Sequence, residues 1–288
     1  MTHWFTYPTN IDPVAIHLGS LSIHWYGIAY LVAFVCVYLW MARPAGRRRL
    51  GLTREQIQDF LFYGLVGVLV GGRTFFVIND IISKHDASFY FSNPINFIAV
   101  WNGGMAFHGG LVGVVVAIVL FLRKHPGLRF RVLGDEVVVM LPLGITLVRL
   151  VNFINDELWG TICVPDRAWC MIPKDTASWP PLNSYRHPAQ LYEAVLDILT
   201  LPLLLLVYRA KPKDGVVAWT WFTAYGITRS VAELWRQADF TFLGITGGQL
   251  YALPMILIGV IGIVYCATRP GPRTEGDVVP VAVATTSQ

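Results

Sequence analysis

The segment Gly144-Ile-Thr-Leu-Val-Arg149-Leu-Val-Asn152-Phe-Ile-Asn155-Asp-Glu157-Leu-Trp-Gly160 places an arginine and two asparagines at the end of a long apolar run. A charged side chain well inside a bilayer costs about 2.5–3.5 kcal/mol even on insertion scales. If this run crosses a membrane, Arg149 therefore needs a charged partner or a ligand. The polar residues that close the segment predict that the helix ends near Asn155 and Glu157.

The composition is that of a membrane protein. Of the 288 residues, 55% are hydrophobic and 14% are charged, whereas soluble domains usually carry about 25% charged residues. The formal charge of +4 reflects basic connections between apolar runs, and no basic block with interleaved aromatics indicates nucleic acid binding. Residues 1–19 contain no basic region before the first apolar run, so we expect a retained first span rather than a cleaved signal.

Seven apolar runs approach the length of about 20 residues that a helix needs to cross a bilayer. They are Leu21–Met41, Phe60–Ile82, His108–Leu122, Val132–Val151, Ala189–Val207, Val216–Trp235 and Gln249–Ala267. The sequence therefore predicts an all-α polytopic membrane protein, a bundle of seven transmembrane helices with a small periplasmic or extracellular cap. We expect residues 1–273 to form a single transmembrane domain with outer-face loops 80–100 and 152–188, and residues 274–288 to form a disordered cytoplasmic tail.

The distribution of lysine and arginine predicts the orientation of this bundle. Basic residues follow the first, third, fifth and seventh runs, at Arg43, Arg47, Arg48, Arg49, Arg54, Arg123, Lys124, Arg129, Arg131, Arg209, Lys211, Lys213, Arg269 and Arg273. By the positive-inside rule these connections are cytoplasmic, which places the N-terminus outside and the C-terminus inside. At 1.5 Å per residue, Arg73, Arg149 and Arg229 then lie ~20–25 Å from the inner face.

The outer half of the bundle is thus expected to hold three arginines, together with His108 and Tyr26 at the outer ends of their spans. Each residue also has a structural alternative when it is taken alone. Arg73, Arg229 and Arg236 could reach lipid headgroups or form ion pairs. His108 could cap or pack, and Tyr26 could belong to an aromatic belt. Chance scatter would place polar residues in both leaflets, so their common depth favours a polar site at the outer face.

Helical spacing predicts which polar side chains share a face. Arg229, Glu233 and Arg236 are four and three residues apart, so Glu233 can pair with one arginine and leave the other partly free. Arg149 and Asn152, three residues apart, also share a face.

Three further sets of residues keep alternative interpretations. Asp135, near the inner face, is expected to cap its helix or to pair with a basic residue. Gly109 and Gly110 could serve helix packing or the approach of a lipid headgroup. Cys163 and Cys170 could form a disulfide if their loop faces an oxidising compartment, and the sequence leaves this open.

The chemistry of these residues favours an anionic lipid as substrate. Arginine donates two parallel hydrogen bonds to phosphate and keeps its charge, and the abundant phosphate of an outer leaflet belongs to phospholipid. Arginines there could stabilise a departing phosphate, with His108 as a candidate proton acceptor. No HExxH or CxxC pattern indicates a metal, and no cofactor is expected. A transporter would need polar residues through both leaflets, and a purely structural protein leaves the arginines unexplained.

Six motifs occur in order between about residue 20 and residue 265. They are Ser22-Ile-His24-Trp-Tyr26-Gly27, Gly71-Gly72-Arg73, His108-Gly-Gly-Leu-Val-Gly113, Arg149-Leu-Val-Asn152-Phe-Ile-Asn155-Asp-Glu157-Leu-Trp-Gly160, His187-Pro-Ala-Gln190-Leu-Tyr192-Glu193 and Gly226-Ile-Thr-Arg229-Ser-Val-Ala-Glu233-Leu-Trp-Arg236. Together they closely resemble the signatures of the prolipoprotein diacylglyceryl transferase family.

The resemblance implies a seven-span enzyme of the bacterial inner membrane, with its active site toward the outer leaflet. Such an enzyme transfers the diacylglyceryl group of phosphatidylglycerol to the lipobox cysteine in the signal peptide of a prolipoprotein, the first step of lipoprotein maturation. A thioether forms and glycerol 1-phosphate is released, and neither a metal nor a cofactor is expected. The partners are then phosphatidylglycerol, the signal peptide and the bilayer.

The resemblance also assigns roles to individual residues. Arg149 and Arg229 would bind and stabilise the lipid phosphate, and His108 would be the candidate base, although nearby arginines could activate the thiol instead. The substrate site would be formed by Tyr26, Arg73, Asn152, Asn155, Glu157, Gly160, Glu233 and Arg236. Asp135 matches a position regarded as important in the family. Two positions depart from the pattern, because the family commonly has glycine where this chain has Val151 and Asp156.

Overall fold

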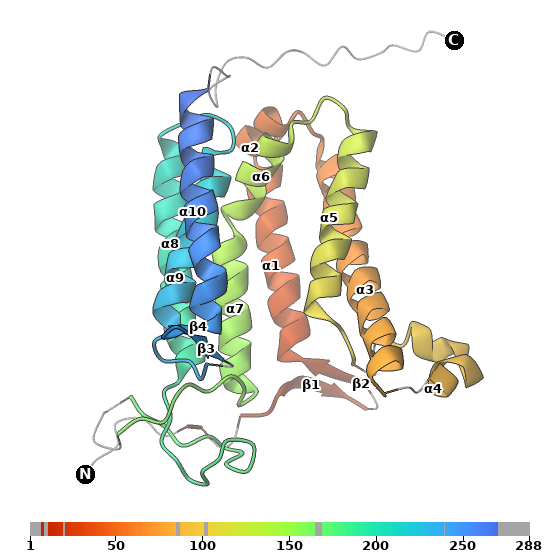
Figure 1. The fold of residues 1–288 in the computed structure, drawn as a ribbon. Coiled ribbons are helices and arrows are strands. Elements are labelled where there is room, and N and C mark those ends of the chain that lie inside the picture. Colours follow the sequence, from red (N-terminus) through yellow and green to blue (C-terminus); the bar gives the residue numbers. More distant parts are fainter. Residues whose placement is uncertain are drawn as a thin grey trace. The chain divides into compact units, whose positions relative to one another are not determined.

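The computed structural model describes residues 7–8, 11–19, 21–84, 87–100, 103–164, 169–238 and 240–269. The predicted tail, residues 274–288, lies outside the described residues. Figure 1 shows a mostly helical chain whose elements are β1 (Val14–Leu18), β2 (Leu21–His24), α1 (Trp25–Ala42), α2 (Pro44–Leu50), α3 (Arg54–Lys84), α4 (Ala87–Ser92), η1 (Pro94–Phe97), α5 (Phe107–Lys124), α6 (Phe130–Val138), α7 (Leu141–Ile154), α8 (Ala189–Arg209), α9 (Val216–Ala232), β3 (Thr241–Phe242), β4 (Ile245–Thr246) and α10 (Gly247–Thr268).

The chain folds into two compact units. The first unit contains the described residues of 1–40 and 131–278, and the second contains those of 41–130. In the first unit, α7 packs against α8, α8 against α9, and α9 against α10, and Figure 1 shows α8, α9 and α10 running side by side. Val138, Val139, Leu204 and Val217 form a buried apolar cluster between α6, α8 and α9.

The helices confirm the class of helical membrane protein. Four of them, α1, α3, α8 and α10, are long and apolar enough to cross a membrane, and α6 with α7 is a fifth candidate. These helices coincide with five of the seven predicted runs. The helices α5 and α9 coincide with the other two runs but do not belong to this group among the described residues; α9 has only 17 residues. Seven spans and their orientation therefore stay predictions.

The predicted span Val132–Val151 is not one continuous helix. It is divided into α6 and α7, which meet at an angle of 44°. Pro142 lies in the first turn of α7, where its missing N–H group costs nothing, whereas inside a longer helix it would remove a hydrogen bond and clash with the preceding turn. Because of this break, the polar residues Arg149 and Asn152 lie on α7, which is a helix separate from α6.

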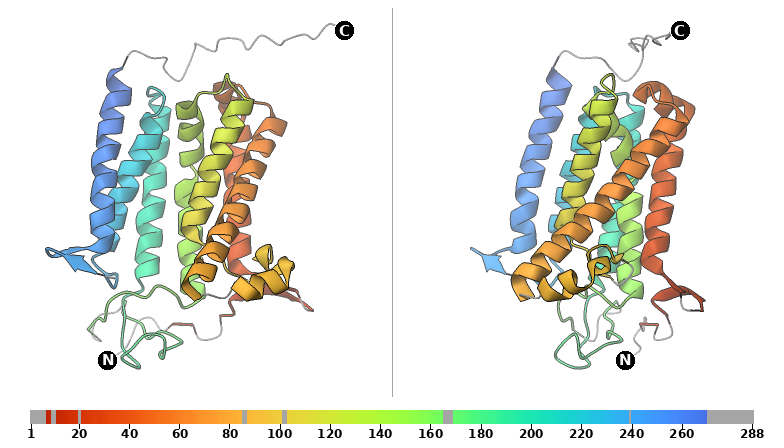
Figure 2. Two further views of the ribbon diagram at one scale, coloured as in Figure 1. Left: turned by 45° about the vertical axis from the view of Figure 1, so that its right-hand side comes forward. Right: turned by 90° about the vertical axis from the view of Figure 1, so that its right-hand side faces the viewer.

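The second unit is built on a close approach of α3 and α5, which Figure 2 shows running beside each other. A Cβ atom at Gly109 would overlap the carbonyl oxygen of Gly71, and one at Gly113 would overlap that of Gly67. Only glycine lets two helix backbones lie this close. The predicted outer loop 80–100 contains the last turn of α3, the helix α4 and the 3₁₀ helix η1.

Two short antiparallel hairpins correct the all-α prediction in detail. Strand β1 pairs with β2, and β3 pairs with β4. The second hairpin leads directly into α10, where the Thr246 hydroxyl accepts from Gln249 N and the Gln249 amide oxygen accepts from Thr246 N. This capping box satisfies two backbone donors at the start of the helix.

Candidate active site

A buried glutamate brings two arginines of the first unit together. Glu193, near the start of α8, lies 2.7 Å through Oε2 from Arg149 Nε, which comes from the last turns of α7. Its other oxygen, Oε1, accepts from Arg236 Nη1 at 2.7 Å. Since α7 and α8 run in opposite directions, the C-terminal end of one meets the N-terminal end of the other at Glu193.

A second carboxylate holds the third arginine. Arg229 Nη1, in the last turn of α9, lies 3.0 Å from Glu233 Oε2 and 3.7 Å from Glu193 Oε1. The predicted pairing of Glu233 with one arginine is confirmed, because Arg236 binds mainly to Glu193 and keeps only a 3.8 Å contact with Glu233. The predicted continuous helix is shorter than expected, since α9 ends at Ala232 and Arg236 follows a turn at residues 233–235.

The cluster of Arg149, Glu193, Arg229, Glu233 and Arg236 has three positive and two negative charges, which leaves one positive charge. The two carboxylate side chains are only 4% exposed, whereas the arginine side chains keep 17–23% of their surface. Buried carboxylates without such partners would be strongly unfavourable. The guanidinium groups are thus oriented by the carboxylates while part of their surface can receive an anionic ligand.

A hydrogen-bonded network continues from Arg149 to the start of α1. Arg149 Nη1 donates to Asn152 Oδ1 at 3.4 Å, and Asn152 Nδ2 donates to Glu157 Oε2 at 3.0 Å and to the hydroxyl of Tyr26. The Tyr26 hydroxyl donates to Glu157 Oε2 at 2.5 Å, and Asn155 Nδ2 donates to Glu157 Oε1 at 3.3 Å. The segment quoted first in the sequence therefore contributes Arg149, Asn152, Asn155 and Glu157 to one connected site.

The backbone turn after α7 places Glu157 in this network. Asp156 has φ = 61°, a left-handed conformation that favours glycine. Here the Asp156 carboxylate accepts from Trp159 Nε1 and from the backbone N–H groups of Lys174 and Asp175, at 2.6–3.0 Å. Asp156 thus compensates for its strained backbone with three hydrogen bonds.

Tyr7 stabilises the same turn from the N-terminal segment. Its hydroxyl donates to the carbonyl oxygens of Phe153 and Ile154, each at 3.1 Å, and these belong to the last turn of α7, whose carbonyls lack helical partners. Burial and the charge of Asp156 raise the pKa of Tyr7 to about 12, so the hydroxyl stays a donor at neutral pH.

Gly160 fixes the backbone of Arg236. The two residues form an isolated antiparallel bridge, and Gly160 N donates to His187 O at 2.8 Å. A Cβ atom at Gly160 would overlap the carbonyl oxygen of Trp235. The absence of a side chain at Gly160 therefore lets the strand-like segment that carries Arg236 lie against the start of α8.

Asp135 lies in α6, at the other end of the helices from the arginine cluster. Its carboxylate accepts from Gly215 N and Ala218 N, each at 2.8 Å, which caps the N-terminus of α9. From the sequence, Asp135 is expected to cap its own helix or to pair with a basic residue. In the structure it is a cap, but the helix that it caps is α9 and not α6.

The predicted site residues of the second unit have local partners. Arg73 is buried, and its guanidinium donates to the carbonyl oxygens of Asn96, Phe97, Gly103 and Gly104 at 2.5–3.1 Å. It thereby ties the segment before α5 to α3, while direct substrate contact by Arg73 stays a prediction.

The other predicted residues of this unit lie in the first turns of α5. The side chain of His108 is exposed. Gly109 takes part in the close α3–α5 approach, whereas a Cβ at Gly110 would only meet Val68 at ordinary distances of 3.7–3.8 Å. Of the two roles that the sequence left open, helix packing and the approach of a lipid headgroup, the structure therefore supports helix packing for Gly109.

Glu193 and Gln190 are two buried polar residues of this part of the fold that the residue-by-residue prediction missed. Both lie in the motif that begins at His187, but Glu193 received no role there. The signal that could have found it is charge balance, because three intramembrane arginines need more than the one carboxylate of Glu233. Gln190 is 1% exposed, and neither its amide oxygen nor its amide nitrogen has a partner among the described residues.

The loop between α7 and α8 carries the only predicted covalent cross-link. Cys163 and Cys170 form a disulfide, which decides the alternative that the sequence left open. His187 lies close to both sulfur atoms, so these three residues form the one group of His, Cys, Asp or Glu with metal-ligand proximity among the described residues. Two of its three donors are joined to each other and offer no thiolate to a metal.

These observations define a multi-pass helical membrane protein with a buried cluster of arginines and carboxylates at one end of α7, α8 and α9. A sequence profile of the prolipoprotein diacylglyceryl transferase family matches residues 13–265. The chain belongs to this family.

Relatives of similar length support the assignment. The chain is 38% identical over 299 residues to the phosphatidylglycerol–prolipoprotein diacylglyceryl transferase of Paraburkholderia phymatum, which covers 91% of this chain and 95% of the relative. It is 39% identical to the protein of the same name from Methylibium petroleiphilum, over 90% of this chain and 98% of the relative. For the protein from Dechloromonas aromatica the identity is 41%, over 89% and 95%.

Proposed function

We propose that this protein transfers the diacylglyceryl group of phosphatidylglycerol to the lipobox cysteine of prolipoproteins. The observation that carries the proposal is the cluster around Glu193, in which three partly exposed guanidinium groups with one excess positive charge lie at one end of a helical bundle. A lipid phosphate supplies the missing negative charge. The names of the relatives, all phosphatidylglycerol–prolipoprotein diacylglyceryl transferases, give the same substrates.

The proposed reaction is a substitution at carbon. The cysteine sulfur forms a bond to the terminal glyceryl carbon of the diacylglyceryl group, and the bond between that carbon and the phosphate oxygen breaks. The thiol proton passes to a base, and both electrons of the broken bond leave with glycerol 1-phosphate. Negative charge therefore develops on the departing phosphate, where donors held in place beforehand are most effective.

Arg149 and Arg229 are proposed to stabilise that phosphate. Glu193 and Glu233 orient the two guanidinium groups through contacts of 2.7 and 3.0 Å, so little reorganisation is needed when charge develops. Because each arginine side chain is only about one-fifth exposed, its hydrogen bonds are made where water competes weakly, and they are correspondingly stronger.

The network beside the cluster is proposed to shape the substrate site. Tyr26, Asn152 and Glu157 are joined by mutual hydrogen bonds, so their side chains hold one another in fixed orientations. Gln190 has a buried amide without a partner among the described residues, and it lies three residues before Glu193 on the same face of α8. It would offer both a donor and an acceptor to the hydroxyl groups of the glycerol headgroup.

His108 is proposed as the base that receives the thiol proton. Its exposed side chain lies in the first turns of α5, and histidine is the side chain that most often acts as a general base. The alternative is that the positive charge of the arginines lowers the pKa of the cysteine thiol, so that a thiolate enters the site. A His108→Gln variant distinguishes them, because a base mechanism loses rate at neutral pH and recovers part of it at high pH.

The proposed membrane arrangement has seven spans, with α5 and α9 added to the helices that pass the length and hydropathy test. Basic residues follow the first, third, fifth and seventh spans, which supports an outer N-terminus and a cytoplasmic C-terminus. In this arrangement the cluster around Glu193 lies toward the outer leaflet of the bacterial inner membrane. Residues 1–273 are then one membrane domain and residues 274–288 a cytoplasmic tail.

Transfer of labelled diacylglyceryl from phosphatidylglycerol vesicles to a lipobox-cysteine peptide tests the function. Purified wild-type protein should form the labelled thioether. Arg149→Lys keeps the charge but loses the fork, and it should lower kcat about 100-fold or more, whereas Arg54→Lys, an exposed residue at the start of α3, should not change it. A folded wild-type protein without transfer, or normal transfer by Arg149→Lys, would contradict the proposal.

A further inference from the structure

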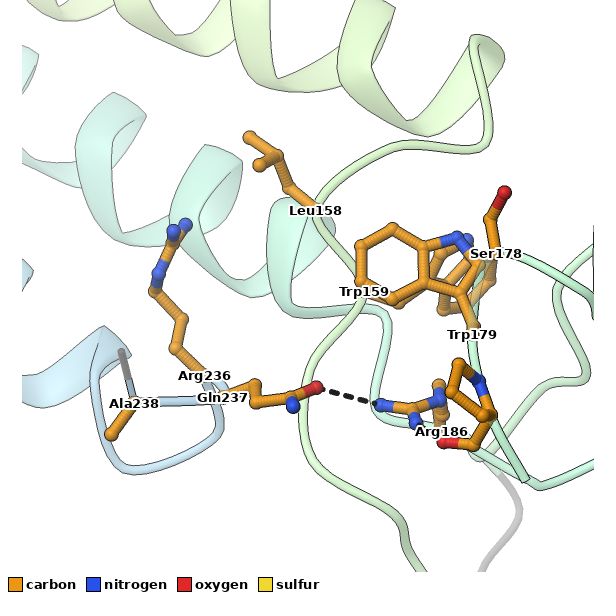
Figure 3. Close-up of a pocket in the computed structure, with 9 residues that line it drawn as sticks. Leu158, Trp159, Ser178, Trp179, Arg186, Arg236, Gln237 and Ala238 are labelled. Atoms are coloured by element: carbon orange, nitrogen blue, oxygen red, sulfur yellow. Dashed lines mark hydrogen bonds between the residues drawn. The ribbon is translucent and has the colours of Figure 1, made fainter. Parts of the chain in front are cut away.

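A pocket adjoins the arginine cluster on the side of the loops. It has a volume of about 410 Å³ and is lined by Leu158, Trp159, Ser178, Trp179, Pro180, Arg186, Arg236, Gln237 and Ala238. All these residues lie in segments that connect helices. Figure 3 shows Arg236 across the pocket from Trp159 and Trp179, with Gln237 and Arg186 joined by a hydrogen bond. The volume lies in the range of small-molecule sites.

The lining carries two positive charges and no carboxylate. Arg236 reaches from the wall of this pocket to Glu193 at 2.7 Å, so the pocket and the cluster share this side chain. Glu157, which adjoins the lining residue Leu158, accepts hydrogen bonds from Tyr26, Asn152 and Asn155. Asp156 and Asp175, two further carboxylates close to the lining residues in sequence, accept hydrogen bonds from the loop itself. The pocket is therefore suited to an anion.

Arg186 fixes the orientation of the Gln237 side-chain amide in the pocket. It is buried, and it donates to the carbonyl oxygens of Gly160 and Pro180 and, at 3.2 Å, to Gln237 Oε1. Because the amide oxygen of Gln237 is held by Arg186, its NH₂ group is left to donate to a ligand. The rings of Trp159 and Trp179, whose N–H groups both donate to Asp156, supply apolar walls.

We propose that this pocket binds a phosphoglycerol group, either as the headgroup of phosphatidylglycerol or as free glycerol 1-phosphate on its way out. The proposal rests on the proposed function for the identity of the ligand. Arg236 connects the two places, since it touches the cluster where the phosphate would be released and also lines the pocket. A water-soluble anion that leaves a site among apolar helices needs such a polar route, and the connecting segments provide it.

Binding of labelled glycerol 1-phosphate to the full-length protein in detergent tests the pocket without any need for transfer. Wild-type protein should bind it saturably. Gln237→Glu keeps the shape and the contact with Arg186 but adds a negative charge, and it should weaken binding about tenfold. Asn183→Asp adds the same charge at an exposed position of the loop between α7 and α8, outside the lining, and at about 0.15 M salt it should change binding less than twofold.

A second pair of variants tests the volume of the pocket. Ala238→Phe should fill it and abolish binding of glycerol 1-phosphate, whereas Ala177→Phe adds the same ring at an exposed neighbouring position that does not line the pocket and should leave binding intact. Unlabelled glycerol, which lacks the phosphate, should not compete.

The transfer assay then separates the two sources of the group. If the pocket receives only the product, Gln237→Glu weakens inhibition by glycerol 1-phosphate and leaves the KM for phosphatidylglycerol unchanged. If it also holds the lipid headgroup, that KM rises as well. The proposal that the pocket binds phosphoglycerol is overturned if wild type, Gln237→Glu and Ala238→Phe bind equally. It is also overturned if wild type shows no saturable binding. Binding that depends on Gln237 in a protein without transfer activity upholds the pocket and contradicts only the proposed function.

Discussion

Glu193 forms an ion pair with Arg149 through one carboxylate oxygen and accepts a hydrogen bond from Arg236 through the other. Without this carboxylate, Arg149 and Arg236 would lose the carboxylate oxygens that lie 2.7 Å from them in a mostly buried site. Like charges repel strongly where water is scarce. A bound phosphate relieves the same repulsion, so the cluster couples its own stability to the presence of an anionic ligand.

We expect Glu193→Gln to lower both stability and activity. Removing one partner of a buried ion pair typically costs about 3–5 kcal/mol, so the melting temperature in detergent should fall by several degrees, and transfer should be lost because Arg149 is no longer oriented. Glu193→Asp keeps the charge and should retain part of both. Added phosphatidylglycerol should restore part of the melting temperature of Glu193→Gln. If the Gln variant melts and transfers like wild type, Glu193 does not organise the arginines.

Gln190 should show the opposite relation between stability and activity. Its amide is buried and has no partner among the described residues, which typically costs about 1–3 kcal/mol in the protein without ligand. Gln190→Leu removes that cost, so the melting temperature should rise or stay constant while the KM for phosphatidylglycerol increases. Gln190→Glu serves as the polar comparison. A Gln190→Leu variant with an unchanged KM would leave the amide without a role in binding the headgroup.

At the scale of the elements, the limits of some helices followed from the sequence because they depend on the length of an apolar run. The run that begins at Ala189 and the helix α8 start at the same residue, and the prediction that α7 ends near Asn155 is confirmed. The break between α6 and α7 was missed, because Pro142 lies within an uninterrupted apolar run and hydropathy does not register the missing N–H group. The hairpins were missed because they are only two to five residues per strand.

The contacts of the site were less predictable than its residues. Depth along the helices correctly indicated that Arg149 and Arg229 lie toward the same end, and spacing indicated the Arg229–Glu233 pair. The pairing of Arg149 with Glu193 joins α7 to α8, and the pairing of Tyr26 with Glu157 joins α1 to the turn after α7. Such contacts depend on how the helices pack and rotate, which no periodicity within one helix contains.

The packing of α3 on α5 provides a test with an internal control. A Cβ atom at Gly109 would overlap the backbone of Gly71, whereas one at Gly110 would make ordinary contacts of 3.7 Å or more with Val68. We expect Gly109→Ala to force the helices apart and lower stability by about 1–3 kcal/mol, while Gly110→Ala is neutral or slightly stabilising because alanine favours the helix. Thermal unfolding in detergent measures both, and equal melting temperatures would contradict the close approach.

At the scale of the whole molecule, the number of spans decides on which side of the membrane each loop lies. Seven spans require that α5 and α9 cross the membrane as well as the five candidates. Each of these helices carries basic residues in its last turn, Arg123 and Lys124 in α5 and Arg229 in α9. Burying Arg229 in a membrane-spanning α9 would be costly, and its contacts with Glu233 and Glu193 offset that cost.

Single cysteines labelled with a membrane-impermeant maleimide on intact spheroplasts should distinguish seven spans from five. In a chain with Cys36→Ala and Cys266→Ala, we expect labelling at Met105→Cys, Ala177→Cys and Thr241→Cys without disruption of the membrane, and at Gly127→Cys and Lys211→Cys only after it, because basic connections stay in the cytoplasm. The pair at 105 and 127 brackets α5, and the pair at 211 and 241 brackets α9. Identical labelling within either pair would show that the bracketed helix does not cross, and seven spans would then be wrong.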